Sequence, residues 1–155
     1  MQSDILWNEV EDLFAEVKHA SLGTVDADGF PRISPIGSVS FTEEGKGYYF
    51  EKFPKTMRKN IERDARMTLM AAHPGAGFWL KSLWKGRFPS QSALRLFCRT
   101  GERRKATQNE IDNFLGKVSM YRFFKGHDLL WKDMNMVREF EVLRIEGLEA
   151  GRMNP

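Results

Sequence analysis

Residues Lys55 to Arg66 read KTMRKNIERDAR, a strongly basic run between two segments rich in aromatic and aliphatic residues. Its five cations and two anions leave a net charge of +3, equal to the formal charge of the whole chain. The run predicts one helix, whose N-terminus presents unpaired backbone N–H groups and the positive end of the helix dipole. Lysine and a hydroxyl at that end, here Lys55 and Thr56, suit a bound phosphate. The alternative is a solvated helix face, which is what basic runs usually form.

Strand-like segments flank this helix on both sides. Tyr48 to Lys52 precedes it, and residues 67–72 follow it. Further upstream, residues 20–25 and 31–41 read as two strands around the turn Asp26-Ala27-Asp28-Gly29, where Asp and Gly favour a tight turn. The first half of the chain therefore predicts strands joined by short connections.

The second half adds three strand-like segments, residues 78–85, 93–104 and 139–146. The middle one alternates, with Leu94, Leu96 and Cys98 on one side and Arg95, Phe97 and Arg99 on the other. Residues 119–137 hold clustered aromatic residues and predict a loop or short helix that docks through them.

Helices are expected at two further places. Residues 3–18 have apolar residues at helical spacing, with Ser3 or Asp4 as the cap. Thr107 and Glu110 form a capping box that starts a second short helix.

About seven strands with mostly tight turns favour antiparallel pairing, since parallel strands need long crossover connections. We therefore expect a mainly β (α+β) protein, an antiparallel barrel or curled sheet with a few helices packed outside it. The 155 residues contain no linker or repeat and predict one domain, residues 1–155.

Several classes of protein are excluded by the composition. The single Cys98 excludes an intrachain disulfide, and its strand pattern predicts a core residue rather than a nucleophile. His19, His73 and His127 lie far apart, so no metal site is predicted. Gly75-Ala76-Gly77 resembles half of a dinucleotide fingerprint but is expected to open a strand, so we discount it. The acidic N-terminus is no signal peptide and no apolar run approaches about 18 residues, so we expect a cytoplasmic protein without a membrane segment.

Successive segments of the chain resemble the FMN-binding split β-barrel proteins, the pyridoxamine 5′-phosphate oxidase-like family. Residues 22–32, LGTVDADGFPR, look like the first hairpin of the family, and residues 33–36, ISPI, look like the strand that lines the flavin. Residues 48–66 look like the phosphate-binding turn and helix of the family, with the successive pieces YYF, KT and NIERDAR. Residues 93–118 are similar to the second half of the barrel. The ordered set covers most of residues 3–118.

The resemblance implies an antiparallel split β-barrel of about six to seven strands, and an FMN-dependent oxidoreductase acting on an unknown small molecule. It implies the following cofactor-binding residues: Arg32, Ile33, Ser34, Pro35, Ile36, Lys55, Thr56, Arg58, Lys59 and Asn60. Met57 stands where classical members carry a phosphate-binding lysine. Either Lys55 with Thr56 or Arg58 with Lys59 must then supply the charge, and the Lys-Thr pair of some small members favours the first.

In the family two chains build each site, so the resemblance also implies a C2 homodimer with the flavin at the interface. Trp79, Trp84 and Trp131 would form that interface, cover the ring or pack in the core, and Arg95 and Arg99 lie near where the partner contributes. No catalytic residue is identified, so any chemistry falls to the bound cofactor. Two further hypotheses stay open: the same fold binding haem or a deazaflavin, and a barrel without enzymatic activity whose strand aromatics stack single-stranded nucleic acid.

Overall fold

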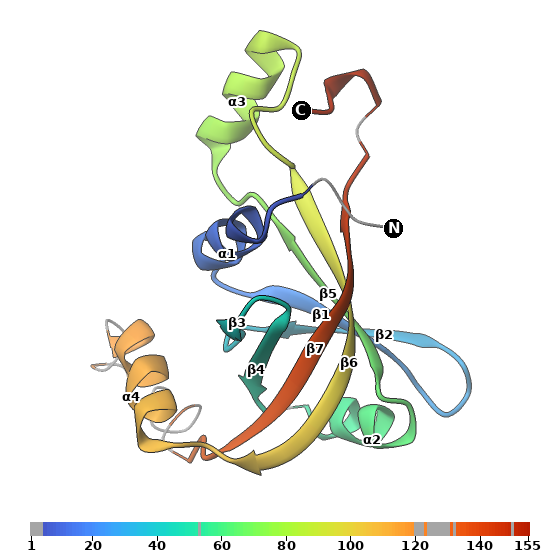
Figure 1. The fold of residues 1–155 in the computed structure, drawn as a ribbon, viewed down its shortest axis with the longest axis vertical. Coiled ribbons are helices and arrows are strands. Elements are labelled where there is room, and N and C mark those ends of the chain that lie inside the picture. Colours follow the sequence, from blue (N-terminus) through green and yellow to red (C-terminus); the bar gives the residue numbers. More distant parts are fainter. Residues whose placement is uncertain (1–4, 53, 120–122, 124–130, 132, 150) are drawn as a thin grey trace.

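The fold is built on one curved antiparallel sheet of seven strands (Figure 1). The computed structural model describes residues 5–52, 54–119, 123, 131, 133–149 and 151–155. The strand order is β2-β1-β5-β6-β7-β4-β3. The strands are β1 (Ala20–Val25), β2 (Pro31–Ile36), β3 (Ser40–Glu43), β4 (Lys46–Phe50), β5 (Arg66–Ala72), β6 (Ala93–Lys105) and β7 (Met136–Gly147). The helices are α1 (Trp7–Glu16), α2 (Lys55–Arg63), α3 (Ala76–Lys85), α4 (Gln108–Lys117) and the short 3₁₀ helix η2 (Gly151–Met153).

The sheet curls without closing, and β2 and β3 are its two edges. The long strands β6 and β7 pair in register except for shifts at Phe97/Cys98 and between Thr100 and Arg103. Such irregularities bend a strand and increase its twist, and Figure 1 shows both strands sweeping round the lower half of the molecule. The open, curled sheet confirms the predicted antiparallel split barrel.

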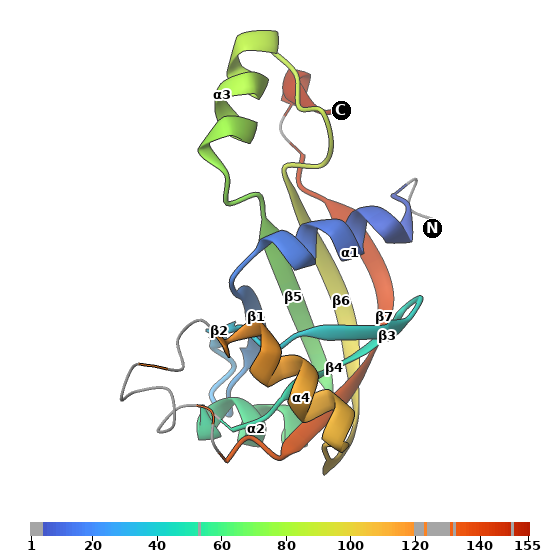
Figure 2. The same cartoon turned by 90° about the vertical axis from the view of Figure 1, so that its left-hand side faces the viewer.

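Helix α1 covers one face of the sheet. Figure 2 shows it lying across β5, β6 and β7. Val10 and Leu13 point inward from the helix and join Leu22 and Leu69 in the main hydrophobic core. The helix begins at Trp7, later than the predicted residue 3, and the proposed caps Ser3 and Asp4 lie outside the described residues.

Strand β6 has the alternation expected from its sequence. Leu94, Leu96 and Cys98 are buried, whereas Arg99 is exposed. Burial raises the pKa of the Cys98 thiol to about 12, which leaves it protonated and poorly nucleophilic near neutral pH. Cys98 is therefore a core residue, as predicted.

A second, smaller core lies beneath α4. Tyr48, Phe50, Phe114 and Val137 are buried in it, and Trp131 packs against them. The predicted capping box starts α4, since Glu110 N donates to Thr107 Oγ1 at 3.3 Å and Thr107 N donates to the Glu110 carboxylate at 2.8 Å. Trp131 docks as expected for residues 119–137, while Tyr121 and Phe124 lie outside the described residues.

The strand predicted at residues 78–85 is wrong, because this segment belongs to helix α3 and runs to its C-terminal end at Lys85. Phe78 and Ser82 face inward one turn apart, a helical spacing that also fits the sequence FWLKSLWK. Gly86 ends the helix in the left-handed conformation, with φ of 65°. Gly75 therefore precedes a helix rather than a strand.

The predicted strand at residues 31–41 is divided into β2 and β3. Between them Ser38 turns inward, where its Oγ accepts a hydrogen bond from Phe50 N at 3.0 Å. The basic run is also divided, because α2 ends at Arg63 and Arg66 opens β5. Asp64 links the two elements by accepting hydrogen bonds from Arg66 N and from its guanidinium.

Candidate functional site

The first turn of α2 borders a cationic cavity. Pro54 caps the helix from extended backbone, and Lys55 and Arg58 follow at a spacing of three, on one helix face. Both side chains line a cavity of about 180 Å³ together with Lys52 and Arg103. Two carboxylates, those of Glu51 and Asp133, share the lining. Each of the two predicted phosphate-binding pairs contributes one residue to the cavity lining, Lys55 from the first pair and Arg58 from the second. Their companions, Thr56 and Lys59, do not line it.

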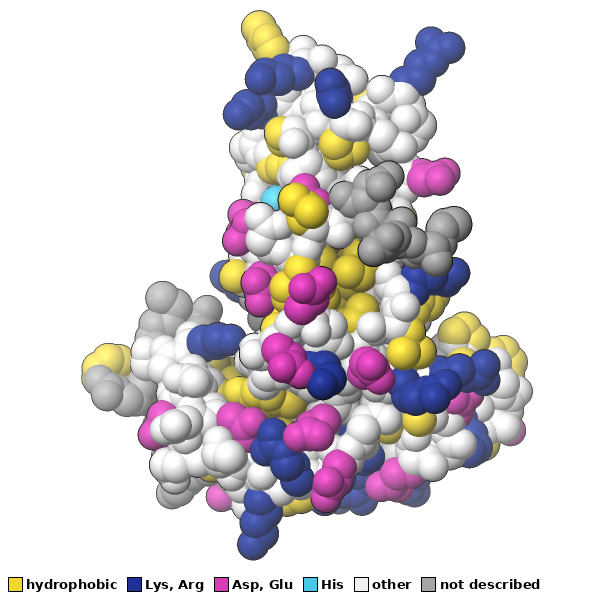
Figure 3. Space-filling view, in the orientation of Figure 1, with side chains coloured by type: hydrophobic (Ala, Val, Ile, Leu, Met, Phe, Trp, Pro, Cys, Tyr) yellow, Lys and Arg dark blue, Asp and Glu magenta, His cyan; other side chains and the backbone are white. Residues whose placement is uncertain are grey.

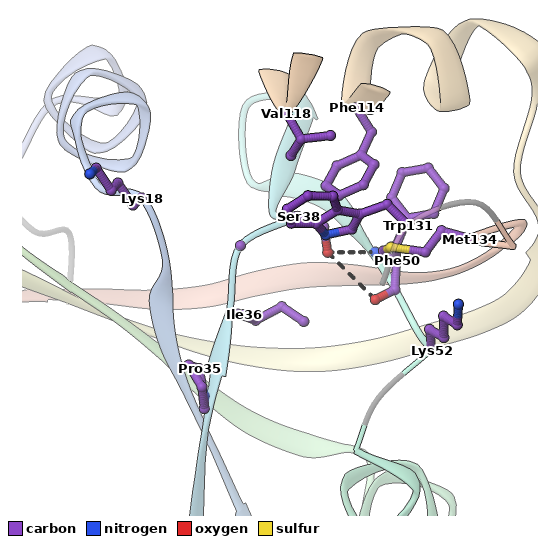
Figure 4. A pocket seen from close by; sticks show the side chains of 11 residues that line it. Lys18, Pro35, Ile36, Ser38, Phe50, Lys52, Phe114, Val118, Trp131 and Met134 are labelled. Atoms are coloured by element: carbon purple, nitrogen blue, oxygen red, sulfur yellow. Dashed lines mark hydrogen bonds between the residues drawn. The ribbon is translucent and has the colours of Figure 1, made fainter. Parts of the chain in front are cut away.

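An aromatic slot lies beside the end of the flavin-lining strand (Figure 4). Its volume is about 260 Å³, and Pro35 and Ile36 at the end of β2 line it. The opposite wall is apolar and comes from β4, α4 and the segment after it. It consists of Phe50, Phe114, Val118, Trp131 and Met134. Figure 4 shows the Phe114 and Trp131 rings beside Phe50, across from Ile36.

The slot and the cavity adjoin, because Lys52 and Met134 line both of them. Lys18, just past the end of α1, brings a second cation to the slot. A ligand lying across the two spaces would meet aromatic surface at one end and concentrated positive charge at the other. This combination suits a planar ring that carries an anionic group.

Besides Thr56 and Lys59, four more of the predicted residues lie elsewhere. Arg32 and Ile33 line a different space of about 650 Å³ on the face of β1, β2, β5 and β6. Arg32 Nε donates to Asp26 Oδ2 at 2.8 Å, which lowers the pKa of that carboxyl. Asn60 is buried and donates to Thr24 Oγ1 at 3.1 Å, so it fastens α2 to β1. Ser34 pairs with Leu22 in the ladder and lines neither the slot nor the cavity.

A buried ion cluster forms the floor of the cationic cavity, and the sequence did not identify it. The Glu51 side chain is 2% exposed and accepts hydrogen bonds from Arg103 Nε at 2.7 Å and from Arg138 Nε at 3.1 Å. The only local signal is a glutamate directly after the buried run Tyr48-Tyr49-Phe50. Its two partners lie on β6 and β7, 52 and 87 residues further along the chain, and only the sheet register brings them together.

Arg58 is held in place with most of its guanidinium left for a ligand. Its Nε makes no hydrogen bond among the described residues but forms an ion pair with Glu62 Oε1 at 3.6 Å, and its side chain is 41% exposed. An oxyanion in the cavity would accept charge-assisted hydrogen bonds from such a group. The four cations that line the cavity therefore fit the phosphate of a flavin nucleotide. The described residues hold no cluster of His, Cys, Asp and Glu suited to a metal ion, and no helix among them is long and apolar enough to cross a membrane.

Comparisons with known proteins agree with this architecture. HupZ of Group A Streptococcus superposes with a TM-score of 0.63 at 18% identity, covering 95% of this chain and 97% of that one. An FMN-binding protein of Syntrophomonas wolfei gives 0.66 at 11% identity, with coverage of 94% and 87%. HutZ, the haem storage protein of Vibrio cholerae, gives 0.54 at 16% identity, with coverage of 90% and 92%.

Sequence comparison supplies the family. No curated protein sequence matches the chain, and identities this low to solved structures establish only a shared fold. The sequence model described as "Pyridoxamine 5'-phosphate oxidase", however, matches residues 6–150. The chain therefore belongs to the pyridoxamine 5′-phosphate oxidase family.

Proposed function

We propose that this protein binds FMN and works as an FMN-dependent oxidoreductase on a small molecule. The observation that carries the proposal is the aromatic slot adjoining a cationic cavity at Lys52 and Met134, which line both. The isoalloxazine ring lies in the slot and the phosphate in the cavity. Membership of the family and the similarity to an FMN-binding protein support this assignment.

The slot orients the ring by apolar contact. Phe50, Phe114 and Trp131 offer aromatic surface, and Ile36 closes the other side. Strand β2 is a sheet edge, so its outer backbone groups near Pro35 are open to polar atoms of a ring. Bound FMN supplies the hydride chemistry, while these residues hold the ring and exclude water.

The cavity supplies charge to the phosphate. Lys55 and Arg58 reach it from α2, with Lys52 and Arg103 beside them. Charge-assisted hydrogen bonds are worth about 1.5–3 kcal/mol each. Among the residues that the resemblance implied for the phosphate, the proposal rests on Lys55 and Arg58.

Absorption spectroscopy of the purified protein tests the proposal directly. We expect a yellow protein that releases FMN on heating, or a colourless one that takes up added FMN. In Lys55→Ala/Arg58→Ala, FMN affinity should fall by about two to four orders of magnitude, while riboflavin affinity stays unchanged. Lys59→Ala is the matched control on the same helix. Protein that takes up no FMN under any condition would refute the proposal.

Haem, or a deazaflavin, is the second candidate ligand for the same slot. The similarity to HutZ, the haem storage protein of Vibrio cholerae, supports haem in this role. A Soret band after adding haem, with no uptake of FMN, would identify it. The nucleic-acid hypothesis expected aromatic side chains on strands, but Tyr48 and Tyr49 are buried, and Phe78 and Trp79 lie on helix α3.

The remaining parts of the proposal concern assembly. The chain acts as one domain of residues 1–155, located in the cytoplasm, and pairs as a homodimer with the flavin site at the interface. Light scattering of the purified protein should give twice the mass of the 18.0 kDa chain. A monomer at micromolar concentration would contradict this part while leaving FMN binding testable on its own.

A further inference from the structure

A polar cluster at the base of helix α3 has no part in the proposed flavin site. Glu16 ends α1, His73 follows directly after β5, and Ser90 lies in the loop before β6. Glu16 Oε2 lies 3.0 Å from His73 Nδ1, and Ser90 Oγ lies 3.5 Å from Nε2 of the same ring. A carboxylate, an imidazole and a hydroxyl from three separate elements are therefore linked in that order.

The carboxylate on one side of the ring decides which ring nitrogen carries the hydrogen. An ionised carboxylate can only accept a hydrogen bond, so the hydrogen of neutral His73 lies on Nδ1 and points at Glu16. Nε2 then keeps its lone pair, which can accept the hydroxyl hydrogen of Ser90. Their 3.5 Å separation is at the long end of hydrogen-bond reach, as such contacts often are before substrate binds. A serine beside a base that a carboxylate orients is the arrangement of a nucleophilic hydrolase.

The imidazole of His73 is fixed by its neighbours. Its side chain is 13% exposed, and its ring stacks on Phe78 with the centroids 3.9 Å apart. Its backbone is held as well, because its N–H donates to Ser92 O at 3.0 Å and its carbonyl accepts from Trp79 Nε1 at 3.0 Å. Figure 3 shows histidine surface beside acidic and apolar side chains, at the height where α1 meets the base of α3. The ring is thus preorganised as a base that solvent and small molecules can reach.

The loop that carries Ser90 is anchored on both sides of it. Before it, Phe88 is buried and its N–H donates to Met153 O at 2.9 Å. After it, the Ser92 carbonyl holds the His73 N–H. Ser90 itself is only half-buried. Its hydroxyl is therefore held near the imidazole while remaining open to a substrate.

The surroundings of Ser90 suit an ester with a short apolar acyl group. The backbone N–H groups of Ser90 and Gln91 donate to none of the described residues, so they are free to stabilise the oxygen that becomes negative during attack. Trp79 is 40% exposed and packs edge-on against Phe88, with the ring centroids 5.5 Å apart. It therefore offers apolar surface beside the loop for an acyl chain.

We propose that Ser90, His73 and Glu16 form a second catalytic site, which hydrolyses carboxylic esters with short apolar acyl groups. Ser90 Oγ attacks the carbonyl carbon while its proton passes to His73 Nε2. The ester C–O bond then breaks, and the leaving alcohol takes that proton. Water attacks the acyl-serine next, and His73 Nε2 takes a proton from the water and returns it to Ser90 Oγ as the acid leaves. Glu16 is a positioning residue that holds the ring in the required tautomer. None of the three residues lines the aromatic slot or the cationic cavity, so this activity needs no flavin.

A fluorophosphonate probe tests the nucleophile on the purified chain. Ser90 Oγ should displace fluoride and form a phosphonate ester, which mass spectrometry of the intact chain and of its peptides locates. The label should be absent from Ser90→Ala, and its rate of formation should fall about 100-fold or more in His73→Phe. His73→Phe removes the base but keeps an aromatic ring to stack on Phe78. Ser92→Ala is the matched control, since Ser92 is a buried serine of the same loop.

Turnover is measured by the release of nitrophenol from p-nitrophenyl butyrate. Ser90→Ala and His73→Phe should each lower kcat about 100-fold or more. Glu16→Gln should lower kcat about tenfold or more with KM unchanged, and Glu16→Asp, which keeps the carboxylate, should recover part of that loss. Glu11→Gln, an exposed glutamate on the same helix, is the control and should match the wild type.

Four results would overturn the inference. The probe labels no residue or a residue other than Ser90, or the wild type hydrolyses the ester no faster than Ser90→Ala does. Hydrolysis depends on His73 but not on Ser90, which would mean that the imidazole itself attacks the ester. Glu16→Gln lowers the stability of the protein but leaves the labelling of Ser90 unchanged, which would reduce the contact to a tether between α1 and α3. FMN titrations of Ser90→Ala should match the wild type, so the fate of this site is read separately from that of the proposed function.

Discussion

At the scale of single residues, the candidate site depends on cations that reach one cavity from different elements. Lys55 and Arg58 follow from the basic helix and were predictable from the sequence, because they are neighbours in it. Arg103 was not, because β6 reaches the cavity only through the curved sheet. Its Nε is engaged by Glu51, and no residue that the structure describes accepts a hydrogen bond from its two Nη atoms. Arg103 is thus oriented by one carboxylate with donors left for a ligand.

Arg103→Ala should therefore weaken FMN binding by about 10- to 100-fold while leaving riboflavin binding unchanged, because only FMN carries the phosphate. Fluorescence quenching titrations with both ligands give the ratio. Arg99→Ala, an exposed arginine on the same strand, is the control. Equal losses for FMN and riboflavin would show that Arg103 supports the fold and not the phosphate.

Glu51 has a different role, since it is almost fully buried between two guanidinium groups. Removing it leaves the buried Arg138 without its bidentate partner. Breaking a buried ion pair in this way costs about 3–5 kcal/mol. Urea unfolding of Glu51→Ala should show that loss, and Glu141→Ala, exposed on β7, should stay within about 0.5 kcal/mol of the wild type. A loss below about 1 kcal/mol would mean that water, or the carboxylate of Glu62 at 3.9 Å from Arg138 Nη2, takes the place of Glu51.

At the scale of elements, local rules predict some helices and strands correctly and fail for others. The capping box of α4 and the alternation of β6 are short-range signals, and both are correct. The segment FWLKSLWK predicts a strand because aromatic residues favour strands, but its inward residues Phe78 and Ser82 have helical spacing. Contacts of Phe78 with His73 and Phe88, which no local pattern shows, hold the segment as a helix.

The start of α4 gives a prediction about pH. The Arg104 guanidinium, together with the smaller effect of the capping box, lowers the pKa of Glu110 to about 2 from an ordinary value of 4.5. A depressed carboxyl pKa adds stability that is complete above about pH 4.5 and is lost as the pH falls toward 2. Glu110→Gln should therefore lower the free energy of unfolding at pH 6 but flatten its decline below about pH 4.5. Unfolding curves between about pH 6 and pH 2.5 measure it, and a parallel decline in both proteins would contradict it.

At the scale of the whole molecule, the aromatic slot joins parts of the chain that are distant in sequence. Lys18 follows α1, Ile36 ends β2, Phe50 ends β4, and Phe114 and Trp131 come from α4 and beyond. The resemblance predicted the strand and the basic turn, which are contiguous motifs. It could not give the aromatic wall, because those residues meet only after β4 and β7 have paired and α4 has folded over them.

Because the slot spans both halves of the chain, a bound ligand should stabilise the folded state as a unit. FMN at about 100 times its dissociation constant should add about 2.7 kcal/mol to the free energy of unfolding, provided that the unfolded chain does not bind it. Riboflavin at the same molar concentration should add less, since it fills the slot but leaves the cavity of Lys55 and Arg58 without an anion. Thermal and urea unfolding over a series of ligand concentrations test this, with the midpoint rising with the logarithm of FMN concentration. Equal shifts for the two ligands would place the ring in the slot without a phosphate contact, and no shift with FMN would mean that the slot does not hold a flavin.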